Sequence, residues 1–395
     1  MREPSMGWRL WIAATLACLF CATELFAQSE TPIPFVSSFS IHSTVLEEER
    51  TIVIALPAGY EEGSTAYPVL YLLDGLQNIW HVAGSAEVLT RTGAMPPVII
   101  VGIQSVNRMR DFTPSSVNDV PYSGGGPKFL DFISKELVPY IDTHYRTHPY
   151  RVLEGHSLAG IFAANAFLEN TQMFNAYIVM SPAMWWNKEE LTAKAKIFFK
   201  THTKFNTSLY LGIGGADGQG MRNELGRFVE VIDQNQPDGL RWEHREMEGE
   251  GHMSAPLLIN YYGLKFVFSD LQLPEQLRVN FDAEQFLAHE KKIVETYGEA
   301  AKQSEENYVT LGLGLMGDEN YQGAITVFNR NIEAYPIYPR NYAWLADAYE
   351  HNLNYSKALE FYIQALEKSQ EINFGQEENY TAQIERLKAL IEEGL

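Results

Sequence analysis

The stretch Gly155-His156-Ser157-Leu158-Ala159-Gly160 decides how the first part of this chain is interpreted. It follows an apolar run at residues 150–153 and precedes residues 161–169, which are rich in helix-forming side chains. A strand, a tight turn with a central serine and a helix form a nucleophile elbow. Such a turn presents the serine hydroxyl to a cleft and directs the free N–H groups of the helix at the same point. Ala159 stands where the usual Gly-x-Ser-x-Gly pattern has its last glycine. Alone, the hexapeptide also suits a helix capped by Ser157.

Apolar runs on both sides of this stretch predict a sheet. Residues 69–73 and 98–103 are continuous apolar runs bounded by turn residues, which is typical of strands buried on both faces. Alternation over residues 35–57 predicts two antiparallel strands joined near Leu46-Glu49. Further strand candidates at 176–180, 209–213 and 240–247 alternate with helical spacing, for example at 127–141. About eight strands, most of them parallel, predict an α/β fold with an antiparallel start.

The N-terminus resembles a secretory signal. Arg2 and Arg9 precede an apolar run from Leu10 to Cys21, and a short stretch ending at Ala27 is followed by polar residues. We expect a signal peptide over 1–27, with an uncleaved anchor or a lipid anchor at Cys18 as the alternatives. No later run is long and apolar enough to span a bilayer. The sequence therefore predicts an exported protein, periplasmic or secreted, with no membrane span after signal removal.

The net charge and the positions of the cysteines exclude several classes of partner and of chemistry. The 395 residues carry a formal net charge of -20, which argues against nucleic acid or an anionic membrane as the main partner. The two cysteines, Cys18 and Cys21, both lie in the expected signal peptide. The mature chain then has no disulfide, no thiol nucleophile and no thiolate metal ligand.

After about Gln272 the strand-like runs stop and charged helical sequence begins. Two copies of a 34-residue pattern occupy about 305–338 and 339–372. Six positions of the first copy recur in the second: Tyr308, Leu311, Gly312, Tyr321, Ala324 and Phe328 against Tyr342, Leu345, Ala346, Tyr355, Ala358 and Tyr362. The pattern resembles tetratricopeptide repeats. We expect an α/β domain over 28–272 and a small all-α domain over 273–395, which either packs on the α/β domain or binds a protein or peptide.

A serine nucleophile needs an acid and a histidine, which follow it in this order in α/β-hydrolases. Asp217 lies just past the strand candidate 209–213, and Glu224 is its rival at a helix start. His252 lies in a glycine-flanked loop after the last strand, whereas His244 falls inside that strand and His156 is expected to pack beside the turn. We therefore predict a triad of Ser157, Asp217 and His252.

The oxyanion of such a reaction needs two N–H donors. Leu158 opens the helix after the elbow and would supply one of them. Gly75 or Leu76, in the loop after the strand at 69–73, would supply the other. In this mechanism His252 accepts the serine proton while Asp217 fixes the imidazole tautomer.

Several separated motifs resemble one esterase family. They are Tyr67-Pro68-Val69-Leu70-Tyr71-Leu72-Leu73-Asp74-Gly75, the elbow, Ser181-Pro182-Ala183-Met184-Trp185-Trp186, the His252 loop, and Thr113-Pro114 after Arg108-Met109-Arg110-Asp111. Over about residues 35–270 the chain resembles the putative-esterase family of α/β-hydrolases, which includes esterase D, enterochelin-type siderophore esterases and feruloyl esterases. The resemblance implies an α/β-hydrolase fold and carboxylic-ester hydrolysis by a Ser-Asp-His triad, with no metal or other cofactor.

The substrate is less well defined. Trp80 and Trp186 could line the cleft, with Trp185 beside them, and Arg110 or Arg108 could meet an anionic group. The alternatives are core packing for the tryptophans and a solvated loop for the arginines. Our first hypothesis is an exported serine esterase for small-molecule siderophore-type or carbohydrate-linked acyl esters. An acyltransferase with the same triad is the second, because the related mycolyltransferases tolerate an alanine at the position of Ala159. A non-enzymatic binding protein that uses the helical repeats is the third.

Overall fold

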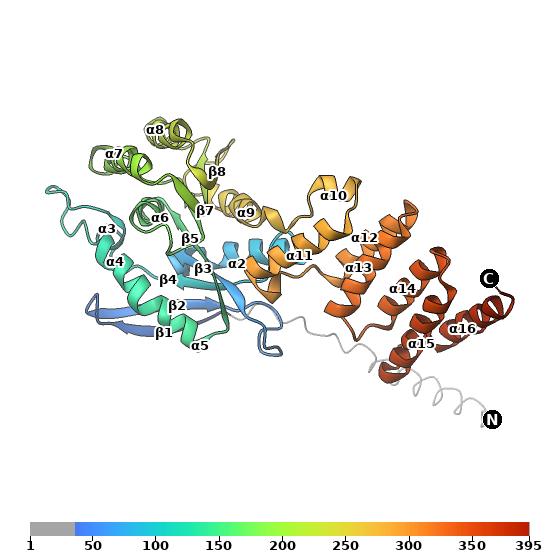
Figure 1. Ribbon diagram of the computed structural model, residues 1–395. Helices are drawn as coiled ribbons and strands as arrows, with labels where there is room; N and C mark the ends of the chain where they lie inside the picture. The colour runs from blue at the N-terminus through green and yellow to red at the C-terminus, as the bar shows by residue number, and fades with distance from the viewer. Residues whose placement is uncertain (1–35, 395) are drawn as a thin grey trace, which may run out of the picture.

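The computed structural model describes residues 36–394, and the expected signal peptide lies outside this range. Its centre is one sheet of eight strands in the order β1-β2-β4-β3-β5-β6-β7-β8 (Figure 1). Pairs β1–β2 and β2–β4 are antiparallel and every other pair is parallel, so the predicted antiparallel start is confirmed. The strands are β1 (Val36–Ser43), β2 (Glu48–Ala55), β3 (Tyr67–Leu73), β4 (Ile99–Ile103), β5 (Thr147–His156), β6 (Ala176–Met180), β7 (Lys204–Gly214) and β8 (Asp238–Met247).

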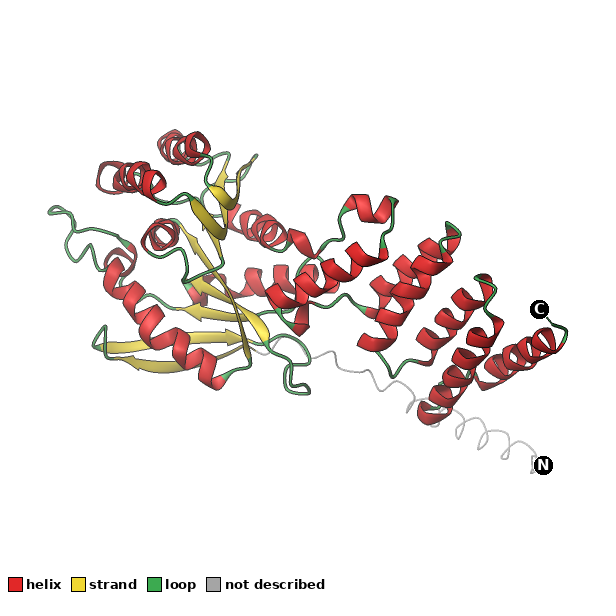
Figure 2. Cartoon of the chain, in the orientation of Figure 1, coloured by secondary structure: helices red, strands yellow, loops and turns green. Residues whose placement is uncertain are grey.

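Helices cover both faces of the sheet, which explains why the parallel strands are apolar throughout (Figure 2). One face packs against α3 (Arg108–Phe112), α4 (Gly126–Phe132), α5 (Val138–His144), α6 (Leu158–Glu169), α7 (Trp186–Thr201) and α8 (Gln219–Asn235). The other face packs against α2 (Gly75–Arg91) and α9 (Ala255–Val267). The carboxyl ends of β3, β5, β7 and β8 therefore lie at one edge, where the predicted site residues gather.

The helix expected over 127–141 is interrupted. A π-helical turn, η1 (Ile133–Leu137), separates α4 from α5. Pro139 lies at the start of α5, and a proline has no N–H with which to continue the regular hydrogen-bond ladder. The apolar spacing predicted the buried face correctly but could not show this change of helical pitch.

The helical region begins with α10 (Glu275–Val279) and α11 (Ala283–Tyr297), followed by the short turn η3 (Glu299–Ala301). Ile293, Tyr297 and Ala301 belong to the same apolar core as Phe268 of the α/β part. The rings of Tyr297 and Tyr150 meet edge to face with centroids 4.6 Å apart. This region therefore packs on the α/β domain, and it extends away from the sheet in Figure 1.

Two helix pairs follow at the predicted 34-residue interval. They are α12 (Glu305–Gly317) with α13 (Tyr321–Ala334), and α14 (Pro339–His351) with α15 (Tyr355–Ile372), and α16 (Glu377–Glu392) ends the chain. Ala324 and Ala358 are fully buried. A Cβ at Gly312 would lie 2.4 Å from the ring of Phe328, so this pair of helices needs glycine opposite the aromatic ring. The helical region is thus established, and its tetratricopeptide identity stays a prediction.

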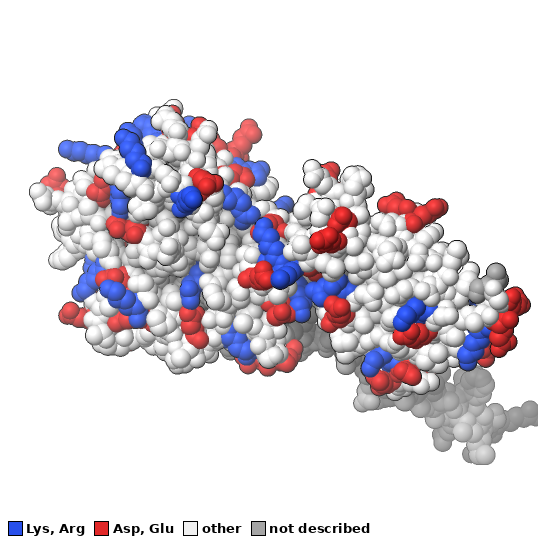
Figure 3. All heavy atoms as spheres, in the orientation of Figure 1, with Lys and Arg blue, Asp and Glu red and all other residues white. Residues whose placement is uncertain are grey.

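Lysine, arginine, aspartate and glutamate are interspersed on the face that Figure 3 shows. Within residues 36–394, no helix combines the length and the apolarity that a bilayer crossing requires.

Candidate active site

Ser157 stands at a strained turn between β5 and α6. Its backbone has φ 62° and ψ -115°, a conformation that non-glycine residues rarely adopt and that is found at functional sites. Its N–H donates to the carbonyl of Met180 at 2.9 Å, and its carbonyl accepts from the N–H of Ala183 at 3.1 Å. The segment after β6 therefore holds the elbow in place.

The structure explains the alanine in the motif. A Cβ at Gly155 would lie 2.3 Å from the carbonyl oxygen of Ala159, and a Cβ at Gly160 would lie 2.8 Å from the carbonyl oxygen of Met180. The close approaches at this turn thus involve Gly155 and Gly160. The side chain of Ala159 itself is fully buried in the core, so it does not face the reacting groups.

The structure brings Ser157, His252 and Asp217 together in one hydrogen-bonded chain. The serine Oγ lies 3.0 Å from Nε2 of His252, and Nδ1 of His252 lies 3.0 Å from Oδ1 of Asp217. The side chain of Asp217 is 1% exposed and that of His252 is 33% exposed. The imidazole is therefore anchored by a buried carboxylate and is itself partly exposed. This arrangement can move a proton from the serine to the histidine and stabilise the resulting imidazolium.

The sequence reasoning did not identify the group that holds Asp217. The buried Ser181 donates its hydroxyl to Oδ2 of Asp217 at 2.6 Å, and the N–H of Gly214 donates to the same oxygen at 3.2 Å. Ser181 also has a left-handed backbone, with φ 38°, directly after β6. Its place in the Ser181-Pro182 motif was the only available signal, because nothing local in the sequence pairs it with an acid 36 residues later.

Backbone contacts lock the acid loop to the histidine loop. The N–H of Gly215 donates to Met247 and that of Ala216 donates to Glu250, each at 2.8 Å. A Cβ at Gly214 would lie 2.5 Å from the carbonyl oxygen of Glu250, so this contact requires glycine. His252 thus reaches the serine from a loop that is pinned on the acid side.

None of the rival residues belongs to this hydrogen-bonded chain. Glu224 is half-buried on α8, and His244 lies in β8, where burial lowers its pKa. His156 is buried, and its ring centroid lies 4.6 Å from that of His252. Burial, reinforced by the nearby His252, lowers the pKa of His156 to about 4. His156 is therefore a neutral ring that packs beside the catalytic candidate.

The three candidate oxyanion donors lie at helix starts. Leu158 is the first residue of α6, where backbone N–H groups have no partner within the helix. Gly75 opens α2, and a Cβ there would lie 2.5 Å from the backbone of Gly102. The N–H of Leu76 donates to the side-chain oxygen of Gln104 at 3.3 Å. That long contact has to open before Leu76 can bind an oxyanion.

The substrate-contact predictions are only partly compatible with the structure. Trp80 is 70% exposed on α2 and can meet a ligand. Trp186 is buried in the core, and its indole N–H donates to the carbonyl of Ser115, so the cleft-lining prediction for it is corrected. Arg110 forms ion pairs with Glu48 and Asp111, and this pairing replaces the predicted contact with an anionic substrate.

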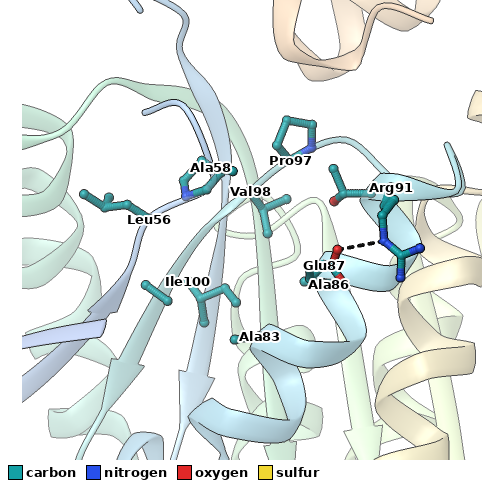
Figure 4. A pocket seen from close by; sticks show the side chains of 12 residues that line it. Leu56, Ala58, Ala83, Ala86, Glu87, Arg91, Pro97, Val98 and Ile100 are labelled. Carbon is teal, nitrogen blue, oxygen red and sulfur yellow. Dashed lines mark hydrogen bonds and ion pairs between the residues drawn. The ribbon is translucent and has the colours of Figure 1, made fainter. Parts of the chain in front are cut away.

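Two cavities border α2. One of about 380 Å³ lies between α2 and α9, next to the loop of His252, and is lined by Gln77, Asn78, His81, His156, Met253 and Leu257 among others. The other, of about 390 Å³, is apolar and lies between β4 and the last turns of α2 (Figure 4). Arg91 pairs there with Glu87 at 2.9 Å. It is at the opposite end of α2 from Gly75, so we do not assign it to the site.

Known proteins resemble this chain in sequence. The family described as "Putative esterase" matches residues 43–255. The ferri-bacillibactin esterase BesA of Bacillus subtilis is 28% identical over 221 residues, which are 49% of this chain and 76% of that protein. The siderophore triacetylfusarinine C esterase of Aspergillus fumigatus is 28% identical over 192 residues, 43% of this chain and 64% of that protein.

Solved structures support the fold. An IroE-like serine hydrolase from Shewanella oneidensis is 26% identical, with a TM-score of 0.65 over 76% of this chain and 99% of that one. A protein from Capnocytophaga ochracea has a TM-score of 0.71 at 17% identity and covers 90% of this chain and 100% of its own. At this identity the second likeness concerns the fold alone. Because it covers 90% of this chain, it includes part of the helical region. The predicted α/β-hydrolase fold is confirmed.

Proposed function

This chain belongs to the putative esterase family and is a carboxylic-ester hydrolase, and from that premise we propose that it is an exported serine esterase that works through an acyl-enzyme on Ser157. The observation that carries the proposal is the chain of two 3.0 Å contacts from the serine through His252 to Asp217. Each member has the chemistry that its place requires: a hydroxyl, an imidazole and a buried carboxylate.

The reaction follows from this geometry. Oγ of Ser157 attacks the ester carbonyl carbon while its proton passes to Nε2 of His252. The N–H of Leu158 and that of Gly75 or of Leu76, the last after release from Gln104, bind the oxyanion. When the intermediate collapses, His252 returns the proton to the leaving alkoxide and the acyl group stays on the serine. Water, deprotonated by His252, then releases the acid and restores the serine.

For the substrate we propose siderophore-type or carbohydrate-linked acyl esters. The siderophore class is supported by the name of the curated relative from Aspergillus fumigatus, a siderophore triacetylfusarinine C esterase. Acyl transfer gains no support from the structure, because Ala159 is buried beneath the elbow instead of facing the site. A panel of siderophore, feruloyl, acetyl-sugar and aryl esters, assayed on one preparation with and without a sugar acceptor, tests the substrate class. The same assay shows whether the acyl group passes to water or to the sugar.

A fluorophosphonate reagent tests the nucleophile. We expect it to label the folded mature protein once, and we expect Ser157→Ala to abolish both labelling and aryl-ester hydrolysis. Folded wild-type protein that is not labelled would contradict the proposal. N-terminal sequencing of the protein recovered outside the cytoplasm tests export, with Gln28 as the expected first residue.

A further inference from the structure

Arg108 connects the two segments that would bind the oxyanion, although the mechanism above does not use it. Its Nε donates to the two carboxylate oxygens of Asp74 at 3.1 and 3.0 Å. Its Nη2 donates to the carbonyl of His156 at 3.4 Å. Asp74 directly precedes Gly75, and His156 directly precedes Ser157. One side chain therefore contacts both the residue before the α2 donors and the residue before the nucleophile.

Asp74 is an unusual neighbour for an oxyanion. Its side chain is 6% exposed, and it sits in a left-handed conformation, φ 53°, at the junction of β3 and α2. A second partner, the hydroxyl of Ser105, donates to it at 2.9 Å. A buried carboxylate repels a developing negative charge strongly, because the protein interior screens charges poorly. The same loop that supplies an oxyanion donor would thus oppose the oxyanion if its carboxylate were unpaired.

Arg108 is placed to remove that conflict. The pKa of Asp74 is raised overall by burial, and the charge of Arg108 and the hydrogen bonds from Ser105 and Arg108 oppose this rise. The side chain of Arg108 is 41% exposed, so it can stay in contact with water while it neutralises the buried acid. It also lies over the ring of Phe112 at 5.7 Å, which restricts its position.

We propose that Arg108 is a positioning residue of the esterase site that acts through Asp74: it neutralises this carboxylate so that the oxyanion forms beside a balanced ion pair. The inference rests on the proposed function, because it requires an oxyanion between Leu158 and the first residues of α2. It differs from the direct role considered from the sequence, in which the arginine would bind an anionic part of the substrate.

Charge variants separate these roles when assayed with p-nitrophenyl acetate, a neutral ester. For Arg108→Gln we expect kcat to fall about 10-fold or more, somewhat less than the loss typical of a missing oxyanion donor. For Asp74→Asn we expect kcat within about threefold of wild type, since no lone carboxylate remains. For the double variant Asp74→Asn/Arg108→Gln we expect kcat above that of Arg108→Gln, and Arg108→Lys should retain more activity than Arg108→Gln.

The opposite results overturn the proposal. Equal losses in Asp74→Asn and Arg108→Gln, with no recovery in the double variant, would show that the contact only braces the loops. A rise in KM for anionic esters with an unchanged kcat for the neutral ester would show direct substrate binding. If Arg108→Gln does not fold, Asp74→Asn still separates bracing, which predicts a large loss of kcat, from neutralisation, which predicts a kcat within about threefold of wild type. Arg91→Gln, which removes an exposed pair at the far end of α2, is the matched control.

Fluorophosphonate labelling of every variant keeps the two proposals apart. A wild-type protein that is not labelled at Ser157 contradicts the serine mechanism itself. A labelled wild type whose charge variants do not follow the expected order contradicts only the role of Arg108.

Discussion

Replacing Asp217 with asparagine should produce the wrong histidine tautomer. The Oδ2 side of Asp217 faces the N–H of Gly214, which can only donate, and the hydroxyl of Ser181. An asparagine must therefore turn its oxygen to that side and its NH₂ group to Nδ1 of His252, 3.0 Å away. Nδ1 then has to accept, so Nε2 carries the proton and can no longer take one from Ser157. In a Ser-His-Asp triad this error costs ~10⁴-fold in kcat, which is about 5 kcal/mol of activation free energy.

The assay is kcat for p-nitrophenyl acetate, with thermal unfolding measured on the same preparations. Asp217→Asn should unfold near the wild-type temperature and lose most of its activity. Glu224→Gln is the matched control, because this rival carboxylate lies on α8 and should keep wild-type kcat. If Asp217→Asn stays within tenfold of wild type, or if Glu224→Gln loses as much, the assignment of the acid is wrong.

Three further predictions concern the scaffold. Ser181→Ala removes a buried hydrogen bond to Asp217, so the free energy of unfolding should fall by about 1.5–3 kcal/mol and kcat should fall with it. An unchanged free energy of unfolding in urea titration and an unchanged kcat would contradict this. Burial raises the pKa of Glu154 to about 8, above its ordinary 4.5, so the folded state holds the proton more tightly and stability should fall as pH rises between these values. In Glu154→Gln this pH dependence should be absent, and the free energy of unfolding at pH 8 should exceed that of wild type by up to a few kcal/mol, at ~1.36 kcal/mol per pKa unit. An unchanged pH dependence in urea unfolding would refute the prediction. Truncation after Gln272 should give insoluble protein, because it uncovers the apolar core that α11 covers. The protein truncated after Ser304 keeps α11 and should be soluble and active. Equal solubility of the two truncated proteins would show that α11 is dispensable.

Local sequence patterns were sufficient for the sheet and for the order of the site residues. The apolar runs are strands because both their faces are covered by helices, and Ser157, Asp217 and His252 each follow a strand at the same edge. Parallel strands bring their carboxyl ends together, so the order along the chain implied proximity in space. The roles of the three residues remain predictions.

Contacts between distant segments were not predictable. A tryptophan after a strand can face solvent or core, and only the packed structure shows that Trp186 turns inward toward Ser115. The position of Arg110 is equally ambiguous in the sequence, because its partner Glu48 lies 62 positions earlier in the chain. Ser181 gave no local sign of its bond to Asp217 for the same reason. Such pairings depend on tertiary geometry, which short-range periodicity does not contain.

The most direct test of the central claim is a rapid-quench experiment with p-nitrophenyl acetate, followed by mass spectrometry of the peptide that contains Ser157. The serine mechanism predicts a burst of p-nitrophenol of about one equivalent per enzyme if deacylation is the slower step. It also predicts an acetyl group on Ser157 that disappears on longer incubation and is absent from Ser157→Ala. Turnover by wild-type protein without any acetylated Ser157 peptide, or undiminished turnover by Ser157→Ala, would contradict it.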